Sequence, residues 1–142
     1  MPARRIAAAV SPLLNFVEWL FSDLAAGVDL FFGAIGAGLL FLMLTRPGIF
    51  AAGNFAGMDW MSLTMWIVFM AATVSLHLAG LFRLHLFKMR FCACLMSSWY
   101  WLTFAFSLTR VSLTTGSFTY SVIGLFALIS AIYISGRSRR AT

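Results

Sequence analysis

Four long apolar stretches, separated by short segments that hold most of the charged residues, dominate this 142-residue chain. A hydrocarbon core of about 30 Å needs about 20 helical residues per crossing, so four crossings take up most of the chain. Charged residues make up only 10% of the sequence, against about 25% in an average soluble domain. The sequence therefore predicts an all-α, polytopic membrane protein with four transmembrane helices and no room for a separate soluble domain.

One membrane domain accounts for residues 1–142. The spans are expected at about residues 24–44, 60–82, 91–108 and 117–134. An N-terminal interfacial segment, residues 1–23, precedes them, and a basic tail, residues 135–142, follows. Because proline and glycine stop helices, Pro47 is expected to end the first span and Gly136 the fourth. The connection between the first two spans is rich in Gly, Ala and Phe and is expected to lie along the membrane surface.

The segment before the first span is long enough to extend its helix. A continuous helix over residues 13–44 would measure about 48 Å at 1.5 Å per residue, which exceeds the hydrocarbon core. Residues 13–23 are therefore expected to form an amphipathic extension that projects into the cytoplasm or lies in the headgroup layer. Arg4 and Arg5 before a short apolar run imitate a secretory signal, but Glu18 interrupts the apolar region and we expect no cleavage.

The Lys and Arg residues are placed unevenly around the spans and indicate their orientation. Eight of the ten fall at the two ends of the chain and between the second and third spans: Arg4, Arg5, Arg83, Lys88, Arg90, Arg137, Arg139 and Arg140. Only Arg46 and Arg110 fall elsewhere. The positive-inside rule puts the cation-rich segments in the cytoplasm, so we expect both termini there, in a bacterial inner membrane. Trp60 and Tyr120 would then begin their spans at the outer interface, where aromatic rings are favoured.

The net charge of +6 is explained by lipid rather than by nucleic acid. The cations are dispersed over the membrane edges and form no continuous basic stripe or recognisable binding motif. Contact with anionic headgroups is the simpler interpretation. The expected partners are the lipid bilayer and either a second copy or another membrane protein, with no nucleic acid.

Polar and small residues recur at steps of three and four along the first helix and share one face. This face holds Asn15, Glu18, Ser22, Ala25, Asp29 and Gly36, with Gly33 beside it. Small side chains permit close backbone approach in lipid, and polar ones bond across the gap, so the face is predicted to pack against another helix. The alternative is that it lines water in an oligomeric pore.

Asp29 is the most informative single residue, because an ionisable group inside a span is costly and implies a partner. It lies as far inside the cytoplasmic edge of the first span as His77 lies inside that of the second. Ser97, Ser98 and Ser130 should reach similar depth. We predict a buried polar layer of Asp29, His77 and one or more of these serines. Its role is either a hydrogen bond between helices or proton transfer, since histidine changes charge near neutral pH.

Residues that would support enzymatic chemistry are lacking. A nucleophile elbow, a phosphate loop and paired catalytic carboxylates are missing, so the chain is not expected to be an enzyme. No cofactor or metal ligand set is predicted, since His77 and His85 cannot sandwich a haem within one chain and no cluster has ligand spacing. Donation of one haem ligand to a larger complex stays open. Cys92 and Cys94 are interpreted as small apolar packing residues, with reversible acylation as the alternative.

Aromatic side chains in the third span are expected to face other helices. Trp99, Tyr100 and Trp101 fall near the middle of that span. Their indole and phenol groups need hydrogen-bonding partners there, because lipid tails offer none. The partners are expected in this chain or in a neighbour.

Several features of the sequence together resemble those of a known group of membrane proteins. They are the four short spans with both ends inside, Trp60, the run Leu81, Phe82 and Arg83, then Arg90, Tyr120, Tyr133 and the pair Gly136 and Arg137. In these the chain resembles small four-span membrane proteins encoded by tailed bacteriophages, mostly of unassigned function and sometimes called holin-like. The resemblance implies a phage-encoded protein of the host inner membrane.

These features lead to one interpretation of function and one rival. The leading interpretation is a non-enzymatic integral protein that acts by self-association or by binding another membrane protein, with a holin-like lesion as its most concrete form. The rival is an accessory membrane-anchor subunit of a respiratory or transport complex. In the rival, the layer of Asp29 and His77 would contact a cofactor, a quinone or a proton path.

Overall fold

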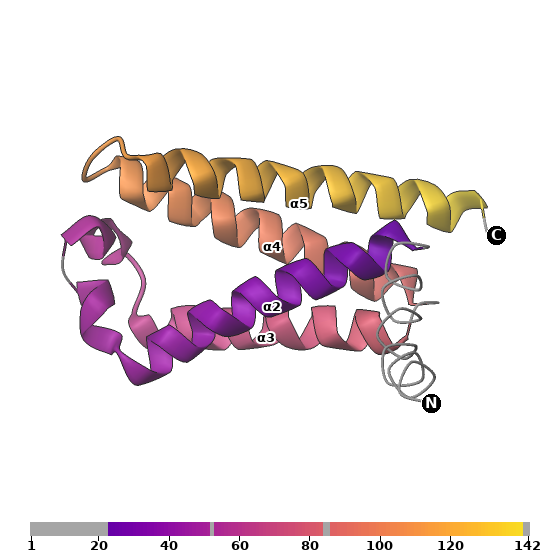
Figure 1. Cartoon of the computed structure of the whole chain (residues 1–142), viewed down its shortest axis with the longest axis horizontal. Helices are drawn as coiled ribbons and strands as arrows, with labels where there is room; N and C mark the ends of the chain where they lie inside the picture. The colour runs from indigo at the N-terminus through magenta and orange to yellow at the C-terminus, as the bar shows by residue number, and fades with distance from the viewer. Residues whose placement is uncertain (1–22, 52, 84–85, 141–142) are drawn as a thin grey trace, which may run out of the picture.

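The computed structural model describes residues 23–51, 53–83 and 86–140, and these residues form an all-α structure (Figure 1). Its long helices are α2 (Leu24–Thr45), α3 (Leu63–Phe82), α4 (Phe87–Thr109) and α5 (Thr115–Arg140). Two 3-10 helices, η1 (Pro47–Ala51) and η2 (Gly53–Met58), connect α2 to α3. Four helices of the described residues are long and apolar enough to cross a membrane, α5 over Thr115–Gly136.

Part of the predicted organisation lies outside the described residues. The N-terminal extension over residues 13–22, with Asn15, Glu18 and Ser22, belongs to that part, as do Arg4, Arg5 and His85.

The first two long helices begin and end at recognisable local signals. Asp23 caps α2, its Oδ1 accepting a hydrogen bond from the Ala25 N–H at 3.1 Å. Arg46 ends α2 directly before Pro47, as the sequence predicts. Helix α3 begins at Leu63 rather than Trp60 because the Ser62 hydroxyl accepts from the Met65 N–H at 3.3 Å and so caps the helix there.

The boundaries of the last two helices differ more from expectation. Helix α4 begins at Phe87 rather than Phe91, which brings Lys88 and Arg90 into its first turn. Helix α5 continues through Gly136 to Arg140, although its candidate membrane-spanning part ends at Gly136, where the fourth span was expected to end. A glycine ends a helix by adopting a left-handed conformation, and Gly136 does not adopt one.

The helices form two hairpins, α2 with α3 and α4 with α5, which join mainly where α3 packs against α4 (Figure 1). The connection formed by η1 and η2 lies at one end of the bundle, where η2 packs on α4. We call this the Pro47 end. The opposite end holds the start of α2, the end of α3, the start of α4 and the end of α5, and we call it the Asp23 end.

Glycines permit the closest approaches within each hairpin. A Cβ atom added at Gly124 of α5 would lie 2.7 Å from Leu102 Cγ of α4, and one added at Gly36 of α2 would lie 2.9 Å from Val74 Cγ2 of α3. Such close backbone approach is how helices pack in lipid, where no hydrophobic driving force acts between them. The described members of the small-residue face of α2, namely Ala25, Asp29, Gly33 and Gly36, are all buried within the chain.

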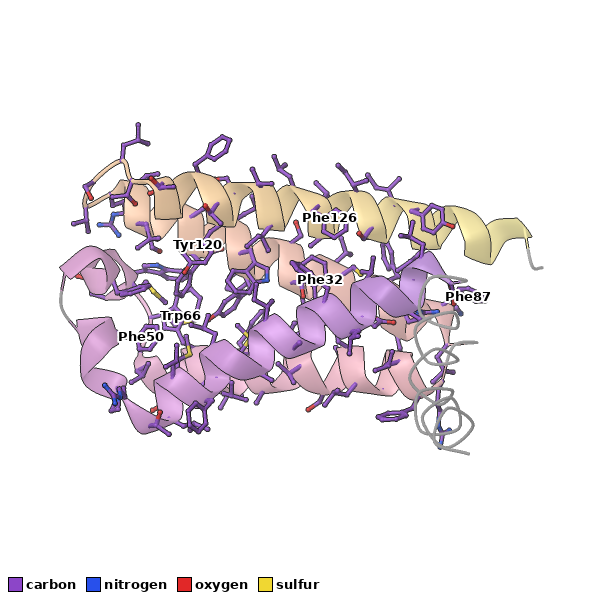
Figure 2. All side chains as sticks on the ribbon, viewed as in Figure 1. Phe32, Phe50, Trp66, Phe87, Tyr120 and Phe126 are labelled. Carbon is purple, nitrogen blue, oxygen red and sulfur yellow. The ribbon has the colours of Figure 1, made fainter. Side chains whose placement is uncertain are left out.

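Aromatic side chains fill the half of the bundle nearer the Pro47 end (Figure 2). Trp66 of α3 packs edge-on against Tyr100 of α4 with ring centroids 5.4 Å apart, and Tyr120 of α5 stacks on Trp101 at 5.5 Å. Tyr100 and Trp101 therefore face other helices, as predicted. Trp99 departs from the prediction in part, because its side chain is 44% exposed even though its ring lies 4.6 Å from that of Phe69.

The polar groups of Trp66, Tyr100 and Trp60 find partners inside the chain. The Trp66 Nε1–H donates to the Met58 carbonyl oxygen at 3.3 Å. The Tyr100 hydroxyl lies 3.9 Å from the Met43 sulfur and donates to it. Trp60 remains half exposed, and its Nε1–H reaches Ser107 Oγ at 3.2 Å. These hydrogen bonds fix the aromatic rings of this half of the bundle in place.

Candidate functional site

Asp29 lies on the second turn of α2 and is buried against two other helices. Its Oδ1 accepts a hydrogen bond from the His77 Nδ1–H of α3 at 2.9 Å. Its Oδ2 accepts from the Arg90 Nε–H of α4 at 2.6 Å, a short distance typical of a charge-assisted bond. Both carboxylate oxygens therefore have donors, and α2 is tied to α3 and α4 through one side chain.

His77 connects Asp29 to a serine on the far side of the imidazole ring. The other ring nitrogen, Nε2, lies 2.8 Å from the Ser97 hydroxyl oxygen of α4 and shares a hydrogen bond with it. Phe32 of α2 stacks on the imidazole, with ring centroids 5.5 Å apart. The structure therefore brings Asp29, His77 and Ser97 together as three members of the predicted polar layer.

Arg90 is the member that sequence reasoning assigned elsewhere. It was predicted to be a topology cation in the turn between the second and third spans, but its side chain is 0% exposed and points into the bundle. Besides Asp29, it reaches Asp23 Oδ2 through Nη1 at 3.5 Å. Arg83 and Lys88 are exposed at the Asp23 end, as expected of topology cations.

The position of Arg90 has a simple cause. Because α4 starts one turn earlier than predicted, Arg90 comes to lie seven residues before Ser97 on the same helical face. A carboxylate buried in a span also requires a compensating charge, since an unpaired buried ion is costly. Extending the predicted third span by one turn, and asking which cation could neutralise Asp29, would have found Arg90.

Gly80 of α3 makes room for this ion pair. A Cβ atom added at Gly80 would lie 2.9 Å from both Arg90 Cγ and Asp29 Oδ2. Glycine is thus needed for α3 to approach the ion pair so closely. Sequence reasoning did not select Gly80, although Gly80 lies three residues after His77 and therefore on the same face of α3.

Two serines of the predicted layer do not join it. Ser130 is buried on α5, but its hydroxyl donates to the Phe126 carbonyl oxygen of its own helix at 2.8 Å. Ser98 is buried on α4, one residue away from Ser97 and therefore turned to a different helix face. We call Asp29, His77, Arg90 and Ser97 the polar cluster.

The order Ser97, His77, Asp29 has the connectivity of a hydrolytic triad, with the imidazole between hydroxyl and carboxylate. The surroundings differ from those of a triad. Ser97 is 1% exposed and lies in the interior of α4, where the backbone N–H groups are used by the helix and do not form an oxyanion hole. The cavity found in the described residues lies at the opposite, Pro47 end. The arrangement can link three helices and can pass a proton along its hydrogen bonds.

Metal binding finds no support in the part of the chain that the structure describes. No group of three or more His, Cys, Asp or Glu side chains there could hold a metal ion. Cys92 is exposed and Cys94 is buried in the packing of α4, and both are free thiols. Cys94 thus fits the predicted role of a small packing residue, whereas Cys92 faces outward.

The sequence matches no family model, no curated protein and no solved structure. The fold and hydropathy therefore define the class: helices of this length and apolarity are those of a small multi-pass integral membrane protein.

Proposed function

We propose that this chain is a non-enzymatic, phage-encoded protein of the bacterial inner membrane that acts by self-association or by binding another membrane protein. The supporting observation is the division between its interior and its perimeter. The polar cluster lies inside the bundle, whereas large apolar side chains occupy the outer surface, among them Phe41, Val68, Phe106, Phe118 and Ile129. Such a surface supports recognition within lipid rather than chemistry in an aqueous cleft.

A holin-like lesion is the most concrete form of this function. The small-residue face of α2 is already packed within the chain, at Gly36 and Gly33 against α3. A lesion built from several copies would therefore associate through the apolar perimeter, or would require α2 to separate from α3. Either route predicts that the membrane lesion forms only after enough copies of the protein have accumulated in the membrane.

The test is induced expression in a bacterium that also makes a muralytic enzyme without its own export signal. We expect an abrupt collapse of membrane potential, read by a potential-sensitive dye, followed by lysis. One control carries an early stop codon in this reading frame, and a second expresses an unrelated four-span protein to the same level. A membrane potential that stays at the level of the second control would contradict the lesion.

One observation favours the rival function, an accessory subunit of a respiratory or transport complex. The hydrogen bonds from Ser97 through His77 to Asp29 cross three helices and form a path along which a proton can move. Purification of the tagged chain from its native membrane should then recover a coloured or transporting complex. Asp29→Asn combined with Arg90→Met removes the proton acceptor without leaving a buried charge unpaired, so it should abolish the complex's proton-coupled activity while the complex still assembles. Unchanged activity would contradict the relay.

A further inference from the structure

A cavity lies at the Pro47 end of the bundle, far from the polar cluster, between the α2–α3 connection and the start of α3. Its volume is about 440 Å³, within the range of ligand sites in proteins. The lining residues are Pro47, Phe50, Met58, Asp59, Met61, Leu63 and Trp66. Phe50 and Trp66 are both labelled near this end in Figure 2.

The wall of the cavity is apolar and held in place by the fold. Met58 and Trp66 are buried, and the hydrogen bond from the Trp66 indole to the Met58 carbonyl fixes the two against each other. Phe50 packs on Phe55, with ring centroids 5.1 Å apart. Six of the seven lining side chains are apolar, so the cavity suits a hydrocarbon group.

Two opposite charges stand at the same end. Asp59, the one ionisable lining residue, is exposed. Arg46, the residue directly before Pro47, is also exposed. Half-exposed Trp60 follows Asp59, and tryptophan is enriched where membrane spans meet the headgroup layer. An apolar hollow with a carboxylate in its lining and an exposed arginine next to lining residue Pro47 in the sequence matches a molecule with a hydrocarbon chain, an ammonium and a phosphate.

We propose that this cavity is a binding site for a zwitterionic phospholipid. One acyl chain occupies the apolar cavity, the headgroup ammonium meets Asp59, and the phosphate meets Arg46, whose guanidinium suits phosphate oxygens. An anionic phospholipid without an ammonium offers no cation to Asp59 and adds a like charge, so it is disfavoured there. This site does not depend on the function proposed above, because it uses none of the residues of the polar cluster.

The test is native mass spectrometry of the full-length protein released from nanodiscs that hold equal amounts of phosphatidylethanolamine and phosphatidylglycerol with identical acyl chains. The wild type should retain one phosphatidylethanolamine in preference to phosphatidylglycerol by about two- to fivefold, the range that an exposed ion pair supplies. Asp59→Asn should bring that ratio to about one while the retained lipid stays, because the cavity is unchanged.

A second variant tests the cavity itself. Leu63→Trp and, independently, Met61→Trp fill it and should abolish lipid retention, with folding checked by helical circular dichroism and a monodisperse elution. Leu113→Trp is the matched control, since Leu113 is 89% exposed in the α4–α5 connection and does not line the cavity. Equal retention of both lipids by the wild type, retention unaffected by filling, or a filled variant that changes the number of protein copies instead of the bound lipid would each overturn the proposal.

Discussion

Asp29 and Arg90 face each other inside the bundle as a buried ion pair, and the consequence of breaking it depends on what is left behind. Arg90→Met leaves a buried carboxylate without its cation, which should lower the free energy of unfolding by about 3–5 kcal/mol. Arg90→Met combined with Asp29→Asn removes both charges and should recover most of that loss, because neutral groups need no ionic partner. Unfolding by SDS in mixed micelles measures the free energy of unfolding of the single and the double variant.

The matched control for the ion pair is Arg83→Met, because Arg83 is exposed at the same end of the bundle. Arg83→Met should have the same free energy of unfolding as the wild type within experimental error. If the double variant were as unstable as Arg90→Met alone, the pair would contribute through side-chain packing rather than through charge compensation.

Gly80 offers a test of how tightly α3 closes over the ion pair. An added Cβ would lie 2.9 Å from Asp29 Oδ2, so Gly80→Ala should force α3 outward and cost about 1–3 kcal/mol, as overpacking does. Gly38→Ala is the matched change in a neighbouring helix, since no atom lies within 4 Å of its added Cβ. We expect Gly38→Ala to leave stability unchanged or slightly raised. Chemical unfolding of the two variants side by side measures the difference between their stabilities. Equal stabilities would contradict the close contact of α3 with the ion pair.

At the scale of helices, hydropathy predicts where a span lies but not which local contacts set its ends. The four spans could be predicted because each apolar stretch is long enough for one crossing. The start of α4 was placed too late because Lys88 and Arg90 were both treated as water-facing, whereas only Lys88 is exposed. Gly136 ends the candidate span of α5, but the helix continues past it because Gly136 keeps a helical conformation.

Some residues of the candidate site could be predicted from the sequence, and others could not. Asp29 and His77 could be related from the sequence, because both lie at matching distances from the same end of their helices. Sequence position alone did not separate Ser97 from Ser98, since the choice depends on the rotation of α4 about its axis. Arg90 follows from extending the third span by one turn, and Gly80 lies three residues after His77 on one face of α3, but only the structure shows how closely α3 approaches the ion pair.

The hairpin of α4 and α5 includes one close contact at a glycine that can be tested directly. A Cβ added at Gly124 would lie 2.7 Å from Leu102 Cγ and 3.0 Å from the Leu102 backbone nitrogen, and the backbone cannot move away as a flexible side chain can. Gly124→Ala should therefore separate the two helices and lower the temperature at which the detergent-solubilised protein loses its monodisperse elution. Gly136→Ala, on the same helix with nothing near its added Cβ, should leave that temperature unchanged. A shift of the same size in both variants would point to helix flexibility rather than to the contact with α4.

For the whole molecule, the basic residues at the two polar ends of the bundle predict its orientation in the membrane. Arg83 and Lys88 are exposed at the Asp23 end, where α2 starts and α5 ends, whereas Arg46 and Arg110 are exposed at the Pro47 end. Burial of Arg90 removes one cation from the first group, since a charge neutralised by Asp29 inside the bundle offers nothing to the membrane surface. The remaining excess, with the basic residues at the end of α5, still favours the cytoplasm for the Asp23 end.

Reporter fusions test this orientation. Alkaline phosphatase is active only outside the cytoplasm. Green fluorescent protein is fluorescent in the cytoplasm and does not fold after export by the general secretion route. We expect fusions after Arg140 to be fluorescent and without phosphatase activity, and fusions after Val111, in the exposed α4–α5 connection, to show the opposite. Arg83→Ser with Lys88→Ser should weaken this bias, while Arg90→Ser should not, because its side chain lies within the bundle. Phosphatase activity after Arg140 would place the Asp23 end outside the cytoplasm, and the cavity at the Pro47 end would then draw its lipid from the inner leaflet.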